Sequence, residues 1–173
     1  MKPKYIKLFE DHWSNLRKLA ELGLVDPDMQ KVLDYMAGSR KGDLMLSGSG
    51  LTALPDGLTV GGSLMLNGSS IQELPAGLWV GHFLSIDHTP IERLPADLQV
   101  GGSISATHSR LRSLPDDLIV HGSLWISDTP IEHLPKGLTV KGDLSMWGTG
   151  VTALPADLRV GREITGFRGH ETP

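Results

Sequence analysis

One stretch of this chain recurs six times with a period of twenty residues. It first reads GDLMLSGSGLTALPDGLTV over residues 42–60 and returns as GSLMLNGSSIQELPAGLWV. Four more copies follow in register, and a seventh begins at Gly161 and breaks off as GREITGF. A fixed period of this length is the signature of a solenoid, in which each repeat forms one coil and buries its apolar residues only by stacking on its neighbours.

Each position of the repeat has its own chemistry when positions are counted from Lys41, so that Gly61 and Gly81 are also position 1. Positions 4 and 6 are apolar with a variable residue between them, which is the pattern of a short strand with one buried face. Positions 11, 14, 18 and 20 are aliphatic in every full copy. These columns predict one continuous core, with a strand over positions 3 to 7, a bend at 8 to 10 and a return segment at 11 to 14.

Position 15 is proline in all six copies, from Pro55 to Pro155. Proline lacks an amide donor and therefore does not sit inside a hydrogen-bonded ladder. It also presets the backbone for the second residue of a tight turn. The sequence therefore predicts a turn at positions 15 to 17 that closes each coil.

The LxL and LPxxL segments of this skeleton resemble bacterial leucine-rich repeats of the short, twenty-residue kind, as found in phage and secreted-effector repeat proteins. The resemblance covers residues 42–160 and implies an α+β fold, a leucine-rich-repeat solenoid with a parallel sheet of about seven short strands. The sequence departs from the family at position 9, where Ser or Thr replaces Asn, as at Ser49 and Thr149. Hydroxyls bond the backbone of a bend more weakly than Asn does. A flatter, β-helix-like stack is therefore the structural alternative.

Residues 1–40 do not repeat. Apolar residues at helical spacing predict a first helix that ends near Gly23. Asp26 and Pro27 suit the N-cap and first position of a second helix, which Gly38 ends. The interpretation is an N-terminal two-helix cap over residues 1–40, followed by the solenoid at 41–167 and a flexible tail at 168–173. The alternative for the two helices is a docking hairpin for a partner.

Composition argues against several classes of function. The formal charge is −4 and the chain carries no basic run, so nucleic acid is not an expected partner. There is no apolar stretch long enough to span a membrane and no secretory signal. The chain has no cysteine, which excludes disulfides and thiolate metal sites. We therefore expect a cytoplasmic protein, with export without a cleaved signal as the alternative.

The sheet face is the predicted binding surface. Side chains at positions 3, 5 and 7 point away from the core, and in leucine-rich repeats that face is the concave binding surface. Because adjacent strands lie about 4.8 Å apart, Trp147 and Phe167 are expected side by side, with Trp125 diagonal to Trp147. Exposed aromatic patches in polar surroundings mark interaction sites. Packing of these rings under the C-terminal tail or a second subunit is the alternative. The predicted partner-binding residues are Trp125, Trp147, Phe167, Phe83, Met45, Met65 and Asp87.

Position 8 holds His88, His108 and Asp128 in three consecutive coils, where the other copies have glycine. Two imidazoles and a carboxylate are suitable ligands for a divalent metal. The outer two, however, lie about 9.6 Å apart at the strand spacing. The favoured interpretation is therefore solvated bend residues, with no metal and no cofactor.

No catalytic motif is present in the sequence. It contains no phosphate-binding loop, no GxSxG and no HExxH. Some similar effector proteins carry a ubiquitin-ligase domain with a cysteine nucleophile, and this chain has neither. We expect a non-enzymatic module that recognises a protein partner through its sheet face. The alternative is a structural or assembly protein that self-associates through its solenoid end, including a homodimer through the C-terminal coil, because no helix is evident to cap that end.

Overall fold

The computed structural model describes residues 15, 18–19, 23, 25–38 and 41–169. The chain divides into two compact units, residues 1–40 and 41–173, which are described separately. In the first unit, helix α2 spans Pro27–Met36. The side chain of Asp26 caps it by accepting a hydrogen bond from the amide of Asp28 at 2.8 Å, and Pro27 occupies the first turn as predicted. The predicted first helix lies mostly outside the described residues, and the capping role of this unit remains a prediction.

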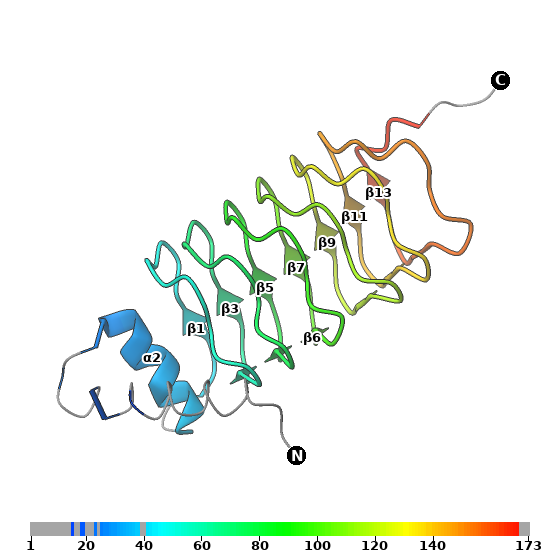
Figure 1. Ribbon diagram of the computed structural model, residues 1–173. Helices are drawn as coiled ribbons and strands as arrows, with labels where there is room; N and C mark the ends of the chain where they lie inside the picture. Colours follow the sequence, from blue (N-terminus) through cyan, green and yellow to red (C-terminus); the bar gives the residue numbers. More distant parts are fainter. Residues whose placement is uncertain (1–14, 16–17, 20–22, 24, 39–40, 170–173) are drawn as a thin grey trace, which may run out of the picture. The chain divides into compact units, whose positions relative to one another are not determined.

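The second unit is a parallel β-solenoid (Figure 1). Seven strands at positions 4 and 5 form one sheet, in which each strand pairs in parallel with the strand twenty residues further on. The strands are shorter than predicted, although backbone hydrogen bonds between coils continue to position 8, where Gly48 donates to the carbonyl of Asn67 at 2.9 Å. The strands are β1 (Leu44–Met45), β3 (Leu64–Met65), β5 (Leu84–Ser85), β7 (Ile104–Ser105), β9 (Leu124–Trp125), β11 (Leu144–Ser145) and β13 (Ile164–Thr165).

A second set of strands, at positions 19 and 20, was not predicted. It forms two separate three-stranded parallel sheets, β2-β4-β6 and β8-β10-β12. The sequence had pointed only to a core role for the valine at position 20. The strands are β2 (Thr59–Val60), β4 (Trp79–Val80), β6 (Gln99–Val100), β8 (Ile119–Val120), β10 (Thr139–Val140) and β12 (Arg159–Val160).

The predicted core columns are confirmed in the interior of the stack, whereas Leu51 at position 11 of the first coil is only half-buried. The pairs Leu84 and Leu124 at position 4, and Ile91 and Ile131 at position 11, are fully buried. The apolar residues at positions 14, 18 and 20 are also buried in the first five coils. In the sixth coil Leu154 is 36% exposed, because no further full coil covers that end of the stack. The predicted tail, residues 168–173, lies mostly outside the described residues.

The hydroxyls at position 9 close the bend in the last four full coils. Thr89 donates to the carbonyl of Ile86 at 2.7 Å, and Ser109 donates to that of Ala106 at 2.6 Å. Both hydroxyl-bearing residues are buried. In these coils the hydroxyl therefore satisfies a bend carbonyl locally, three residues back along the same coil.

Position 8 is left-handed in all six coils. Its φ is +70° at Gly48, and it is +56° at His88, +58° at His108 and +56° at Asp128. Only glycine adopts this conformation without steric cost, and Asp and His are among the residues that tolerate it best. The bend geometry thus explains why this column is glycine in the other copies.

Candidate functional site

Polar side chains at position 3 of the sheet face hold the coils together. The carboxylate of Asp43 accepts a hydrogen bond from the amide of Ser63 at 2.7 Å. Farther along the stack, the hydroxyl of Ser103 accepts from the amide of Ser123 at 2.9 Å, and that of Ser123 accepts from the amide of Asp143 at 3.0 Å. These side chains extend the ladder beyond the strands, so they serve the fold.

Asp87, one of the predicted partner-binding residues, is also tied into the fold. One carboxylate oxygen accepts from the hydroxyl of Ser105 at 2.5 Å and from the amide of Thr107 at 2.7 Å. The other accepts from the hydroxyl of Ser85 at 3.0 Å. Both oxygens are thus engaged by donors of this chain, which makes Asp87 a link between two coils.

Several exposed apolar side chains lie on the face of this same sheet. Trp147 is 54% exposed, and Met45 and Trp125 are also exposed. Phe83 and Met65, by contrast, are half-buried. Phe83 and Trp125 form an edge-to-face pair with ring centroids 6.2 Å apart. When coils are numbered from residues 41–60, this pair joins coil three (81–100) to coil five (121–140). The small residue between them in the ladder, Ser105, is buried.

The expected contact between Trp147 and its two aromatic neighbours is not found. Within the described part of the chain, no ring contact joins Trp147 to Trp125 or to Phe167. Trp125 pairs with Phe83 instead. Gly166 has a φ of +80°, and a Cβ there would collide with the backbone of Trp147. The chain therefore leaves the path of the repeat just before Phe167, which is exposed.

The position 8 residues form a row along the bend edge. The rings of His88 and His108 stack, with centroids 4.8 Å apart and an interplanar angle of 17°. His108 Nε2 lies 3.4 Å from Asp128 Oδ2, and both side chains are about half exposed. The described residues include no group of three His, Cys, Asp or Glu side chains that could hold a metal ion. An exposed pair of this kind contributes little to stability.

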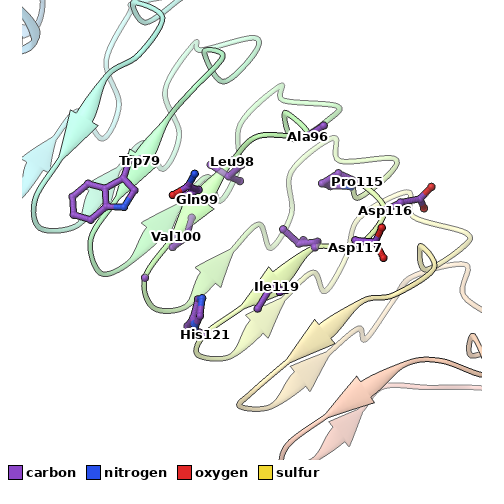
Figure 2. A pocket seen from close by; sticks show the side chains of 12 residues that line it. Trp79, Ala96, Leu98, Gln99, Val100, Pro115, Asp116, Asp117, Ile119 and His121 are labelled. Atoms are coloured by element: carbon purple, nitrogen blue, oxygen red, sulfur yellow. The ribbon is translucent and has the colours of Figure 1, made fainter.

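A cleft of about 380 Å³ opens on the other side of the coils, where β6 and β8 are not paired. Figure 2 shows Trp79 at one end of it and Asp116 with Asp117 at the other. Ile119 and His121 also line the cleft. Trp79 and Ile119 are exposed apolar residues that the sequence analysis missed. The signal was available, because positions 18 and 20 flank a variable position 19 as positions 4 and 6 flank position 5.

A scan against models of protein families finds no match, and a search of curated proteins finds no matching relative. In the ranges that the structure describes, no helix has both the length and the apolar character needed to cross a membrane.

Proposed function

We propose that the protein is a non-enzymatic module of the leucine-rich-repeat type that binds a protein partner through the face of its seven-stranded sheet. The observation that carries this proposal is the exposure of Trp147, which is 54%. The other five full coils have Ser, Thr, Asn or Asp at this position, so the coil does not need a tryptophan there. An exposed tryptophan in polar surroundings is typical of a binding hot spot.

The Trp147→Ser variant tests this proposal. Its melting temperature should match that of the parent chain, because the side chain is mostly in solvent. Its affinity for a partner captured from native extract by cross-linking should fall by about 2 kcal/mol or more, the scale of a hot-spot residue. Arg112→Ser is the control, since Arg112 is an exposed residue outside the strands of this sheet and outside the other cleft. A large drop in the melting temperature of Trp147→Ser would show that the ring serves packing.

Self-association through the C-terminal coil is the second candidate function. It is favoured by Leu154, whose column is buried in every earlier coil. The neighbouring core residues Leu158, Val160 and Ile164 are only half-buried. Sedimentation over a dilution series separates the two candidates. An assembly protein should dissociate on dilution and should become monomeric in a Leu154→Lys variant, whereas a partner-binding module should stay monomeric throughout.

A further inference from the structure

The ladder of the second set of strands follows one rule wherever it is intact. The amides at position 19 and at the first residue of the next coil donate to carbonyls at positions 18 and 20 of the coil before. Trp79 thus donates to the carbonyl of Leu58 at 3.1 Å, and Gly81 donates to that of Val60 at 2.8 Å. Two such bonds per coil close this side of the solenoid.

Between coils three and four this rule fails. No described residue accepts a hydrogen bond from the amides of Ile119 and His121, and none donates to the carbonyls of Leu98 and Val100. At this seam between coils three and four, two donors and two acceptors therefore have no partner among the described residues. Unpaired backbone groups of this kind take up water or the backbone of another molecule.

The interruption coincides with a change of turn conformation. Asp117 has a φ of +56°, whereas Asp97, at the same position of the preceding coil, is not left-handed. The carboxylate of Asp97 reaches back and accepts from the amide of Gly77 at 2.8 Å. The amide of Asp117 donates forward to the carbonyl of Lys136 at 2.9 Å. The two turns therefore bond away from each other, and the strands that follow them do not pair.

The core side chains next to the seam are slightly more exposed than their counterparts in the preceding coil. Leu98 is 9% exposed and Val100 is 5% exposed, while Leu78 and Val80 in the same columns are fully buried. Both residues are still buried, but a small part of their apolar surface is accessible beside the unpaired backbone groups. A ligand that fills the seam would bury that surface and satisfy the hydrogen bonds together.

The groups around the seam specify the ligand further. Trp79 and Ile119 are exposed and offer apolar surface at the cleft. Asp116 and Asp117 lie at the far end of the cleft (Figure 2), and their carboxylates form no ion pair or hydrogen bond with any described residue. This end therefore complements a cationic side chain.

We propose that this cleft binds an extended peptide segment of a partner protein that carries a Lys or Arg side chain. The peptide backbone bonds the amides of Ile119 and His121 and the carbonyls of Leu98 and Val100, in the manner of strand addition to an open sheet edge. Its basic side chain lies against Asp116 and its neighbour. The site is on a different sheet from the binding face proposed above and does not depend on it.

Hydrogen exchange of the full-length chain, followed by NMR, provides the first test. The amides of Ile119 and His121 should exchange at least tenfold faster than those of Thr139 and Lys141. The latter two hold the same positions in the next coil and donate to carbonyls of the preceding coil at 2.9 Å. Equal protection of the two pairs would mean that the ladder is closed, and the proposal would be overturned.

Titration with capped hexapeptides provides the second test. The probe alternates valine with lysine and arginine, and its controls carry glutamate in place of the basic residues or N-methyl groups on alternate amides. Only the basic, unmethylated peptide should shift the resonances of Ile119 and His121 and slow their exchange. Binding by the glutamate peptide, binding by the methylated peptide, or no saturable shift with the basic peptide would each contradict the proposal.

Substitutions inside and outside the cleft test whether the basic peptide binds there. Replacing Asp116 and Asp117 together by Asn should weaken the basic peptide at least tenfold, and Asn tolerates the left-handed turn at the second site. Glu132→Gln, which removes an exposed carboxylate outside the cleft, should leave the affinity unchanged. Equal weakening by both variants would overturn the assignment. Shifts of Ile119 that follow protein concentration without peptide would identify a second copy of the chain as the occupant and would also overturn it.

Discussion

Ser69 and Ser109 occupy the same position of the repeat, two coils apart, and are equally buried at 3% exposure, yet their hydroxyls differ. The hydroxyl of Ser109 donates to the carbonyl of Ala106 at 2.6 Å. The hydroxyl of Ser69 has no hydrogen-bond partner within the part of the chain that the structure describes. The same side chain thus makes its bend hydrogen bond in one coil and not in the other.

This difference predicts unequal costs for the same substitution. Ser109→Ala removes a buried hydrogen bond and should lower the free energy of unfolding by about 0.5–1.5 kcal/mol. Ser69→Ala removes a buried hydroxyl without a partner and should be neutral or slightly stabilising. Chemical denaturation of the two variants measures both effects. An equal loss in the two would mean that both hydroxyls are bonded in solution.

The left-handed bend predicts a second matched pair. Gly48 has a φ of +70°, and a Cβ placed there would meet nothing within 4 Å. Gly48→Ala should therefore destabilise the chain by about 1–2 kcal/mol through backbone strain alone. Gly50 has the same open surroundings without a positive φ, and Gly50→Ala should change stability by less than about 0.5 kcal/mol. Thermal melts compare the two, and equal effects would argue against the left-handed bend.

Much of this architecture could be predicted from the sequence, because each core position is aliphatic or otherwise apolar in all six copies of the repeat. The burial of Leu84 and Ile91 follows from that periodicity alone. The second ladder was predictable in principle, since Leu98 and Val100 flank a variable residue. Its interruption was not, because Asp97 and Asp117 are the same residue type in the same column and differ only in backbone conformation.

The surface was less predictable than the core for a similar reason. Spacing placed Trp125 near Trp147, but ring contacts depend on side-chain rotamers and on the path of the backbone between coils. Trp125 reaches Phe83 instead, and the turn at Gly166 takes Phe167 away from the repeat path. Asp87 was expected to face a partner because its position in the repeat lies on the sheet face. Its hydrogen bonds to Ser105 and Thr107 cannot be read from the sequence pattern.

The packing of the middle coil predicts a large cost for a cavity. Ile104 is fully buried on β7, and Ile104→Ala should lower the free energy of unfolding by about 2–5 kcal/mol. Ile119 is 52% exposed, so Ile119→Ala should cost less than about 0.5 kcal/mol. Urea denaturation of both variants makes the comparison. A loss below about 0.5 kcal/mol for Ile104→Ala would contradict the register of the repeat.

The three hydrogen bonds to Asp87 predict that this surface residue matters for stability. Asp87→Ala leaves the amide of Thr107 and the hydroxyls of two serines without their acceptor, and should cost about 1–3 kcal/mol. Asp116→Ala is the control, because that carboxylate makes no bond to a described residue, and it should be nearly neutral. If the two variants melt together, Asp87 is free to serve a partner.

The edge-to-face pair of Phe83 and Trp125 predicts an energetic coupling across coil four. A double-mutant cycle with Phe83→Ala and Trp125→Ala should give a coupling of about 0.5–1.5 kcal/mol in the free energy of unfolding, as expected for an aromatic pair. The matched cycle of Phe83→Ala with Trp147→Ala should be additive within about 0.5 kcal/mol, because those rings make no contact. Chemical denaturation of the two sets of variants supplies the measurement. Equal coupling in both cycles would mean that the aromatic residues form one cluster in solution.

The expected result instead makes Trp125 partly a residue of the fold, so its substitution would alter stability and binding together. Trp147 would then be the side chain whose loss reports on partner binding alone.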